Sequence, residues 1–306
     1  MIVLIEGLGS IASRHIDALL ALIPEVKIYA LRSGKGGRNH PNVYDITDLA
    51  KLESVPDFII ISNPSVKHYE SIEKYLTFEK PLFIEKPSLT SLKQVDYLLN
   101  SIQNRAIKTY VACNLRFLPI IEFLKKEFDQ NPPLELRCYS GSYLPDWRPG
   151  TNYKTSYSAS KMLGGGVHLD LIHELDYVYY FFGAPNHVYS HTDTISNLGI
   201  ESEDYAHYHL IYEKTMVSVT LNYFRKAPKR EIEVTFNDQV WLVNLLNSTV
   251  TDLQTGQIVF RSEVTIRDTY LSQMRYFLEY VNGKAQALNS FEESIEVLKI
   301  CLNESA

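Results

Sequence analysis

The sequence has few cysteines, no long hydrophobic run and no recognisable leader. Its three cysteines, Cys113, Cys138 and Cys301, are odd in number and far apart, which argues against a disulfide framework and against a paired metal motif. No apolar run approaches the roughly 18 residues of a membrane span. The start, MIVLIEG, lacks a basic region and a small-residue cleavage site. We therefore expect an unprocessed, soluble protein of the reducing cytoplasm, with no membrane partner.

The chain also has little net charge. Thirty Lys and Arg residues stand against 36 Asp and Glu residues, which gives a net charge of -6. No basic block is long enough to follow a phosphate backbone, so we expect no nucleic-acid partner. With 45% hydrophobic and 22% charged residues, the 306-residue chain suits a globular protein and excludes collagen-like or disordered classes. Its length corresponds to about two domains.

The first part of the chain, to about residue 112, alternates short apolar runs with helical patterns. Strands are predicted at 2–5, 26–31, 58–61, 82–84 and 110–112, and helices at 12–23, 66–76 and 89–100. This alternation is typical of βαβ units around a parallel sheet whose strands are buried on both faces.

After residue 117 the pattern changes to one of antiparallel strands with one covered face. A helix is predicted at 120–128, and β-rich stretches follow at 134–143, 187–195, 205–212, 217–224, 231–236, 240–243 and 258–260. Helical segments are predicted at 166–182, 269–281 and 291–302. The pattern therefore indicates a nucleotide-type α/β domain followed by an α+β domain.

A glycine-rich turn follows the first predicted strand and opens the first helix. Its sequence matches GxGxxA through Gly7, Gly9, Ser10, Ile11 and Ala12. In this context the glycines allow a tight turn and close approach of a pyrophosphate, and the helix N-terminus faces the phosphates. The alternative is a glycine-rich turn that caps an ordinary βα unit.

The end of the second strand bears on the choice of cofactor. Twenty positions after Ala12 stands Arg32, followed by Ser33, where an acidic residue would bind the ribose of NAD. A guanidinium can bind a 2'-phosphate bidentately, so we expect NADP, with NAD as the alternative. The competing interpretation is that Arg32 is a solvated charge after a strand.

Two further segments carry residues suited to proton transfer. Glu85 and Lys86 follow the strand 82–84 at the end where open α/β sheets bind ligands, and a lysine there can stabilise a developing alkoxide. A triple glycine at 164–166 leads into a predicted helix with Asp170 and His173 on one face. Histidine titrates near neutral pH and suits removal of a hydroxyl proton. A strand-end charge pair and a structural histidine are the alternatives.

These motifs, taken in order, resemble those of the Gfo/Idh/MocA family of NAD(P)-dependent oxidoreductases. They are GLGSIA, Asn63-Pro64 with His68, IEKP, Asn114-Leu115-Arg116-Phe117, and GGGVHLDLIHELD. The resemblance covers essentially the whole chain. It implies an α/β Rossmann domain at 1–115 and an α+β domain with a large, mostly antiparallel open sheet at 116–306. The second domain would bind substrate and form a homodimer or homotetramer, and the closing helices could pack back on the first.

The resemblance also implies an activity and roles for residues. Family members mostly move a hydride between a sugar or cyclitol carbon and the nicotinamide. Lys86 matches the lysine that contacts the reacting hydroxyl and the nicotinamide ribose, His173 the general acid/base, and Asp170 the acid that precedes it. Further matched positions are a proline often found cis, Pro87, and positions around the cofactor, Asn63, Pro64, His68 and Glu85. The family spacing is Asp-x-x-x-His, one residue longer than here, so Asp176 stays an alternative partner of His173.

The substrate is less constrained by the sequence. Aromatic and cationic residues precede the triple glycine, and with Arg116 they could bind a polar ring that carries an anionic group: Trp147, Arg148 and Tyr153. An ordinary loop with a buried tryptophan is the alternative. Other functions remain open, namely a non-catalytic NADP-binding regulatory protein and an NAD-dependent glycosidase of the same family. No ligand set forms a recognised metal signature, although His168, Asp170 and His173 with His207 and His209 have suitable side chains.

Overall fold

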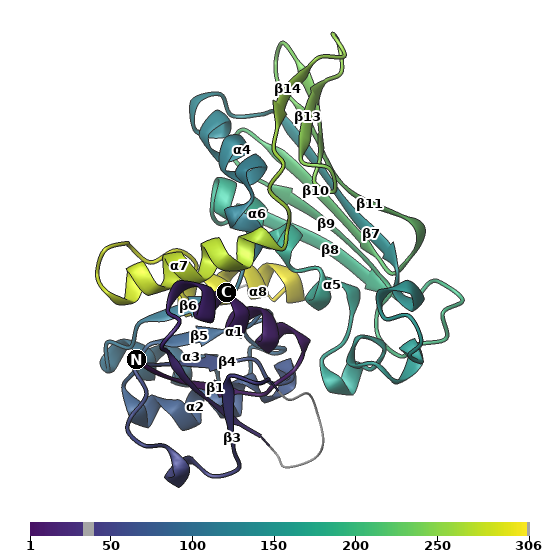
Figure 1. Cartoon of the computed structure of the whole chain (residues 1–306). Helices are drawn as coiled ribbons and strands as arrows, with labels where there is room; N and C mark the ends of the chain where they lie inside the picture. Colours follow the sequence, from purple (N-terminus) through teal and green to yellow (C-terminus); the bar gives the residue numbers. More distant parts are fainter. Residues whose placement is uncertain (33–39, 305–306) are drawn as a thin grey trace. The chain divides into compact units, whose positions relative to one another are not determined.

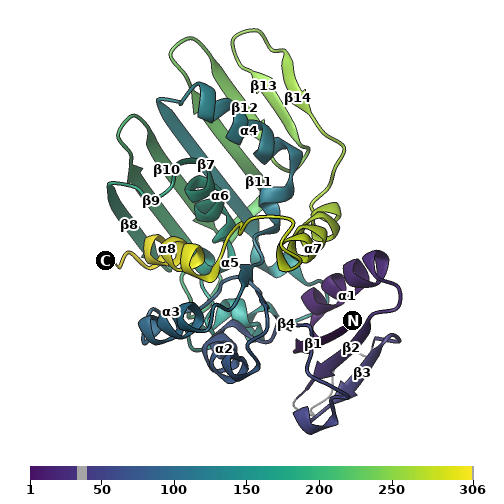
Figure 2. The same ribbon diagram turned by 90° about the vertical axis from the view of Figure 1, so that its left-hand side faces the viewer.

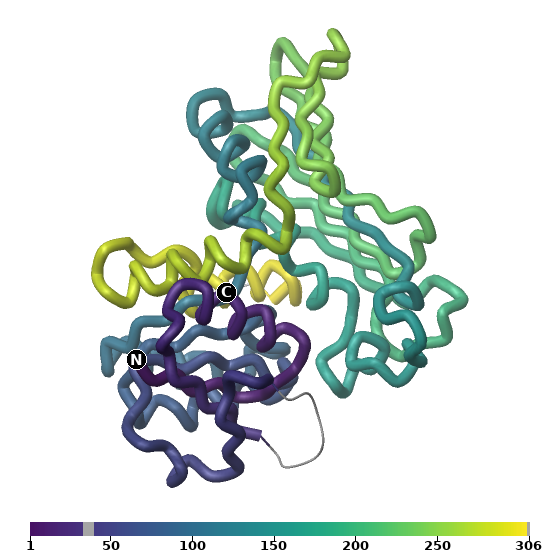
Figure 3. The backbone as a smooth tube through the Cα atoms, in the orientation of Figure 1, coloured from purple at the N-terminus to yellow at the C-terminus, as the bar shows by residue number. Residues whose placement is uncertain are grey.

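The structure is a computed structural model that describes residues 1–32 and 40–304 and divides into two compact units (Figure 1). The first unit comprises Met1–Asn114 and Ile266–Leu298. The second begins with Leu115–Thr265 and includes the residues after Leu298. The chain therefore leaves the first unit, forms most of the second, and then returns to the first, a course that can be followed in Figure 3.

The first unit contains a six-stranded parallel sheet in the order β3-β2-β1-β4-β5-β6. Its strands are β1 (Ile2–Glu6), β2 (Lys27–Leu31), β3 (Val43–Ile46), β4 (Phe58–Ile61), β5 (Leu82–Ile84) and β6 (Thr109–Val111). Every residue of β4, β5 and β6 is buried, as expected of strands covered on both faces. The strand order reverses between β1 and β4, and ligands of such sheets bind at the carboxyl ends of the strands beside this point.

Helices from both ends of the sequence complete the first unit. They are α1 (Ser10–Leu22), α2 (His68–Tyr75), α3 (Val95–Asn104) and α7 (Asp268–Val281), with α8 (Phe291–Leu302) beginning here. The residues α1 buries recur at helical spacing, among them Ala12, Ile16 and Leu19. Beside α1 lies α7 (Figure 2), and its Phe277 packs edge-on against Phe83 of β5, 5.1 Å between ring centroids. The core of the first unit thus includes a segment from near the end of the chain.

The second unit is built on an eight-stranded sheet in the order β14-β13-β12-β11-β7-β10-β9-β8. Its strands are β7 (Glu135–Tyr143), β8 (His187–Asp193), β9 (Tyr205–Ile211), β10 (Met216–Asn222), β11 (Phe224–Thr235), β12 (Val240–Asn244), β13 (Thr249–Asp252) and β14 (Ile258–Arg261). One neighbouring pair, β7 with β10, is parallel, and the remaining pairs are antiparallel.

One face of this sheet is covered by helices. The second unit contains α4 (Pro119–Gln130), α5 (Val167–Asp170) and α6 (His173–Phe182), and α4 and α6 lie over the same face (Figure 2). Along β9, Tyr208 and Leu210 are buried, whereas the alternate His207 and His209 are half-buried. This alternation places the histidines on the opposite face.

The predicted fold class is confirmed, with an α/β Rossmann unit and a large, mostly antiparallel sheet. Several local predictions are wrong. The helix expected at 89–100 begins at Val95, after Gln94 at a φ of +61°. The helix expected at 166–182 is interrupted at Leu171–Ile172, which separates α5 from α6. Strands β3 and β13 were not predicted. Within the described residues, no helix is long and apolar enough to cross a membrane.

Candidate active site

The glycine-rich turn at residues 7–12, called the fingerprint turn, joins β1 to α1 at the carboxyl edge of the parallel sheet. Gly7 has a φ of +89°, and a Cβ atom on it would come within 2.8 Å of Asn63 Cα, so the position requires glycine. Gly9 precedes the first residue of α1, and a Cβ atom on Gly9 would meet nothing within 4 Å. The space beside Gly9 is therefore open to a ligand.

The first turn of α1 presents backbone N–H donors at this position. It contains no acidic residue, and no side chain of the described chain caps it. The N–H groups of Ser10, Ile11 and Ala12 precede the first i to i−4 bond, which Ser13 donates to the carbonyl of Gly9. These donors and the positive end of the helix dipole suit a phosphate group. The turn therefore fits the pyrophosphate of a nicotinamide dinucleotide.

Two neighbouring strands bring further predicted residues to the same edge. β4 pairs with β1, and β5 pairs with β4, all in parallel register. Asn63 and Pro64 follow β4, and Glu85 and Lys86 follow β5, so all four lie at the carboxyl ends of strands beside the fingerprint turn. The Asn63 amide donates a hydrogen bond to Ser71 Oγ at 2.7 Å, which fixes it against α2.

A buried histidine holds the turn after β5. His15 of α1 is fully buried, and its Nε2 lies 2.5 Å from Glu85 Oε1. The second oxygen of Glu85 accepts a hydrogen bond from the backbone N–H of Lys86 at 3.0 Å. The Lys86-Pro87 peptide bond is cis, as the resemblance implies. His15 therefore positions the backbone of Lys86 through Glu85, whose side chain is only 10% exposed.

A second buried histidine, His68, braces the same turn from α2. Its Nδ1 lies 3.0 Å from the carbonyl oxygen of Pro87, and its Nε2 lies 3.1 Å from that of Asn63. Burial lowers the pKa of His68, although the nearby carbonyl oxygens oppose this effect. Because the ring is fully buried, these contacts favour an indirect role at the cofactor. Direct contact of His68 with the cofactor stays a prediction.

Arg32 at the end of β2 has an acidic neighbour that was not predicted. Its Nη1 donates to Asp45 Oδ2 at 2.6 Å, and the Arg32 side chain is 14% exposed. Asp45 comes from β3, so the missing strand prediction also hid a carboxylate near the expected 2'-phosphate site. Ser33, the other residue expected there, lies outside the described residues. The preference for NADP stays a prediction.

The second unit holds Asp170 and His173 at the junction of α5 and α6. The triple glycine that precedes α5 is closely packed, since a Cβ atom on Gly165 would come within 2.2 Å of the Tyr157 carbonyl oxygen. Asp170 Oδ2 accepts a hydrogen bond from the hydroxyl of Tyr223 at 2.5 Å. Burial and the Asp170 carboxylate both raise the pKa of Tyr223, so the hydroxyl keeps the proton that it donates. Asp170 and His173 are themselves 5% and 9% exposed.

Asp176, the alternative partner of His173, forms a buried ion pair with Arg116. The guanidinium donates from Nε and Nη2 to the two carboxylate oxygens at 2.9 and 2.7 Å. Both side chains are almost fully buried, and the guanidinium carbon lies 4.9 Å from the centroid of the Tyr180 ring. Whether Asp170 or Asp176 assists His173 stays a prediction. The ion pair favours a structural role for Arg116, whose contact with substrate stays a prediction.

Two of the three predicted aromatic and cationic substrate residues lie near Asp170. Trp147 packs edge-on against Tyr223, with 5.3 Å between ring centroids. The guanidinium of Arg148 lies 5.4 Å from the ring centroid of Tyr157. The pKa of Tyr157 is raised by burial and by the Asp170 carboxylate. Trp147 and Arg148 therefore contact the two tyrosines that flank Asp170.

The third predicted substrate residue has a different environment. The Tyr153 hydroxyl donates to the carbonyl of Leu198 at 2.9 Å, which ties two loops of the second unit together. The role of Tyr153 in substrate binding stays a prediction.

Sequence reasoning missed two residues that organise the candidate site, His15 and Tyr223. His15 follows Ala12 at helical spacing on the stripe that faces the core, and a titratable residue on such a stripe is a usable signal. Tyr223 lies between β10 and β11 and carries no local signal of its partner, 53 residues earlier in the chain. Across the described residues, no group of three or more His, Cys, Asp or Glu side chains is placed to hold a metal ion.

Three features together define an NAD(P)-dependent dehydrogenase. They are a Rossmann unit with an open fingerprint turn, a Glu-Lys-Pro turn that buried histidines hold in place, and a second unit with a large open sheet. Family comparison agrees. Residues 1–112 match the oxidoreductase family with an NAD-binding Rossmann fold, and residues 133–240 match the GFO/IDH/MocA C-terminal domain. The chain belongs to the Gfo/Idh/MocA family. No curated protein sequence matches it significantly.

Solved structures with similar folds cover nearly the whole chain. UDP-N-acetylglucosamine 3-dehydrogenase GnnA from Acidithiobacillus ferrooxidans has a TM-score of 0.79 at 18% identity, covering 99% of this chain and 96% of its own. Myo-inositol 2-dehydrogenase from Lactobacillus plantarum has a TM-score of 0.78 at 19% identity, with 99% and 95% covered. An oxidoreductase from Agrobacterium radiobacter, in complex with NAD+, L-tartaric acid and magnesium, has a TM-score of 0.79 at 17% identity, with 99% and 94% covered. At these identities the likeness shows the fold.

Proposed function

We propose that this dehydrogenase transfers a hydride between a nicotinamide dinucleotide and a secondary alcohol or ketone carbon of a sugar, sugar derivative or cyclitol. The observation that carries the proposal is the Lys86 turn. Lys86 follows the strand β5 at the same sheet edge as the fingerprint turn, and its backbone is held by Glu85, which is held in turn by His15. Members of this family with named substrates include a sugar-nucleotide and an inositol dehydrogenase, which supports a polyhydroxylated substrate.

The proposed roles follow from the chemistry of the side chains. When bound, the nicotinamide dinucleotide supplies the acceptor or donor of the hydride. The Lys86 ammonium donates a hydrogen bond to the reacting oxygen and stabilises negative charge that develops there. His173 removes the hydroxyl proton in the oxidative direction and returns it in the reductive direction. We assign the orientation of the His173 ring to Asp170, whose carboxylate the Tyr223 hydroxyl holds, with Asp176 as the alternative.

Replacement of Lys86 tests the assignment. Lys86→Ala should lower turnover by orders of magnitude with a panel of sugars and cyclitols, while NADPH binding, measured by fluorescence titration, stays largely intact. Lys93→Ala, at an exposed lysine of the same unit, is the matched control and should behave as the unmodified protein does. Near-normal turnover of Lys86→Ala would overturn the role of Lys86.

The proposed cofactor is NADP, with NAD as the alternative. Support comes from the Arg32 guanidinium at the end of β2, although its pairing with Asp45 means that a 2'-phosphate would have to share or displace this contact. Titration with NADPH and NADH compares the two directly. Arg32→Ala should weaken NADPH binding more than NADH binding, and clearly tighter binding of NADH to the unmodified protein would contradict the proposal.

We further infer a cytoplasmic homodimer or homotetramer. The three cysteines are free and buried, which suits a reducing compartment. The sheet face that carries His207 and His209 is the surface that the family resemblance implies for subunit contact. Light scattering coupled to size exclusion measures the mass, and a monomer at micromolar concentration would contradict the assembly.

A further inference from the structure

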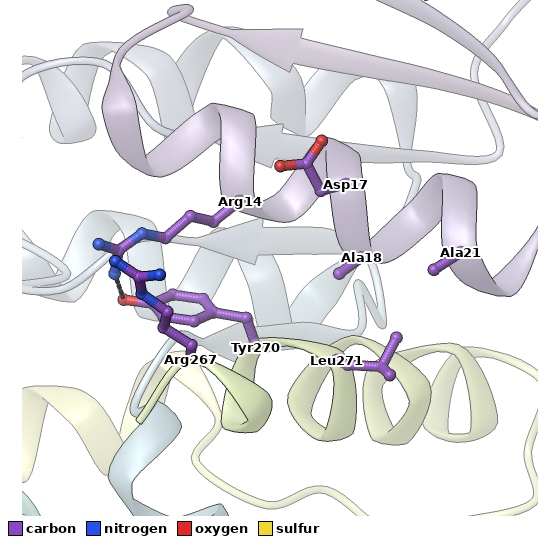
Figure 4. A pocket seen from close by; sticks show the side chains of 7 residues that line it. All are labelled: Arg14, Asp17, Ala18, Ala21, Arg267, Tyr270 and Leu271. Carbon is purple, nitrogen blue, oxygen red and sulfur yellow. Dashed lines mark hydrogen bonds between the residues drawn. The ribbon is translucent and has the colours of Figure 1, made fainter. Parts of the chain in front are cut away.

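A groove between α1 and α7 of the first unit contains two exposed arginines that have no acidic partner among the described residues. Arg14 of α1 and Arg267, which precedes α7, line a cavity of about 430 Å³ with Tyr270, and both side chains extend toward the same end of it (Figure 4). Within residues 1–32 and 40–304, neither arginine forms an ion pair. Both side chains are exposed, so water and salt screen the repulsion between them, and an anion bound at both guanidinium groups would offset what remains.

The acidic residue of the groove does not neutralise these charges. Asp17 also lines the cavity, but its carboxylate points away from the arginines (Figure 4). It lies 3.2 Å from Nε2 of His40 instead. The positive charge of Arg14 and Arg267 is therefore left for a ligand.

Tyr270 organises the cationic end of the groove. Arg14 Nη1 donates to the Tyr270 hydroxyl oxygen at 2.9 Å, and the Arg14 guanidinium carbon lies 5.0 Å from the centroid of the same ring. These contacts hold Arg14 in one position before any ligand binds. Burial raises the pKa of Tyr270, and the charge of Glu85 adds to this effect. The hydroxyl therefore keeps its proton and can donate a hydrogen bond to an anion.

The rest of the groove is apolar and small. Ala18 and Ala21 of α1 face Leu271 of α7 along the cavity (Figure 4). The volume lies within the range of about 300–1,000 Å³ that is typical of small-molecule pockets. An occupant should therefore combine an anionic group at the arginines with a compact apolar body between the two helices.

We propose that this groove binds a phosphate monoester with a small apolar body. A phosphate monoester carries a charge of about -1.5 to -2 at pH 7, which matches two guanidinium groups better than a carboxylate does. Arg14, Arg267 and the Tyr270 hydroxyl donate to the phosphate oxygens, and the strip formed by Ala18, Ala21 and Leu271 contacts the body. The groove adjoins the His15–Glu85 contact, because the Tyr270 ring packs edge-on against His15 with 5.8 Å between centroids, but Arg14, Arg267 and Tyr270 have no role in the activity proposed above.

Calorimetric titration of the full-length protein with phenyl phosphate tests this site. We expect saturable binding at one site, with weaker binding of benzoate, which carries one charge, and of inorganic phosphate, which lacks the apolar body. Arg14→Gln and Arg267→Gln should each weaken phenyl phosphate binding about tenfold or more, about 1.4 kcal/mol or more each. Arg105→Gln, at an exposed arginine of the same unit, should change the affinity less than twofold.

The arginine variants also separate this groove from the fingerprint turn, which is the other phosphate-binding feature of the unit. Phenyl phosphate that binds at the fingerprint turn would keep its affinity in Arg267→Gln, and that result would overturn the proposal. Absence of saturable binding to the unmodified protein would overturn it as well. Binding of NADPH to Arg267→Gln should be unchanged, because Arg267 lies outside the fingerprint turn. A loss of NADPH affinity in parallel with phenyl phosphate would instead assign the arginines to the cofactor site.

Discussion

The buried Arg116–Asp176 pair allows a quantitative test of what this ion pair does. In Asp176→Asn the guanidinium of Arg116 keeps its charge but faces one neutral amide oxygen in place of the two carboxylate oxygens, at a site where the two side chains are only 1% and 2% exposed. Loss of one partner of a buried ion pair typically costs about 3–5 kcal/mol. That is a large fraction of the roughly 5–15 kcal/mol by which domains are stable. The midpoint of thermal unfolding should fall by on the order of 10 °C.

The sequence supplies a probe that reports the affected unit. Its two tryptophans, Trp147 and Trp241, both lie in the second unit, so tryptophan fluorescence during urea unfolding follows that unit. Asp129→Asn is a matched control, because Asp129 pairs with Lys125 on α4 but is 59% exposed. Its cost should stay below about 1 kcal/mol.

A double variant separates loss of the pair from loss of a charge. In Arg116→Met with Asp176→Leu no buried charge is left without its partner, so the variant should be more stable than Asp176→Asn. If Asp176→Asn unfolds within about 1 kcal/mol of the unmodified protein, the reasoning is refuted. If the double variant folds well but loses substrate affinity with KM raised and kcat kept, Arg116 binds substrate as the sequence suggested.

Three further predictions concern other buried groups. Tyr223→Phe removes the hydrogen bond to Asp170 and should lower kcat about 10- to 100-fold. The control variant Tyr212→Phe should leave kcat unchanged. Equal steady-state rates for the two variants would contradict a role for Tyr223. Burial lowers the pKa of His68 below its usual 6.5, so the unfolded chain takes up the proton first and stability is lost as pH falls through about 6.5. His68→Asn should make urea midpoints between about pH 7.5 and 5.5 less dependent on pH, and an unchanged slope would count against this. Burial raises the pKa of Cys138 and of Cys301 to about 12, so iodoacetamide should alkylate neither thiol in the native protein. Mass spectrometry should find both thiols alkylated in urea. Fast labelling of either cysteine in the native protein would contradict this prediction.

Most helices and strands could be predicted because each is marked by a run or spacing of apolar residues within a short stretch of sequence. The strand 58–61 is four consecutive apolar residues and is wholly buried, and the fingerprint turn is contiguous in sequence. β3 was missed because Tyr44 and Asp45 are exposed at the sheet edge and leave no apolar run. The interruption between α5 and α6 was missed because Leu171 and Ile172 are ordinary helix residues, and the backbone departs from helix there without glycine or proline.

The candidate site was predicted only where its residues stand in contiguous motifs. Lys86, Asp170 and His173 were proposed in this way. The contacts that hold them join residues 70 positions apart, as in His15 with Glu85, or 53 apart, as in Asp170 with Tyr223. Such contacts depend on how strands are ordered in the sheet, which no local window contains. The same holds for Asp45, whose approach to Arg32 requires β3.

The first unit is assembled from two distant segments of the chain, which has a consequence for synthesis of the protein. α1 emerges from the ribosome early, but its partner α7 begins at Asp268. At about 5–20 residues per second, on the order of ten seconds or more pass before α7 exists. During that interval the face of α1 that lies against α7, which includes Ala18 and Ala21, has no final cover, and the nascent unit must rely on transient contacts or on a chaperone. A chain that stops after Thr265 would keep this surface uncovered permanently, so premature termination should produce an aggregation-prone fragment rather than a functional nucleotide-binding domain.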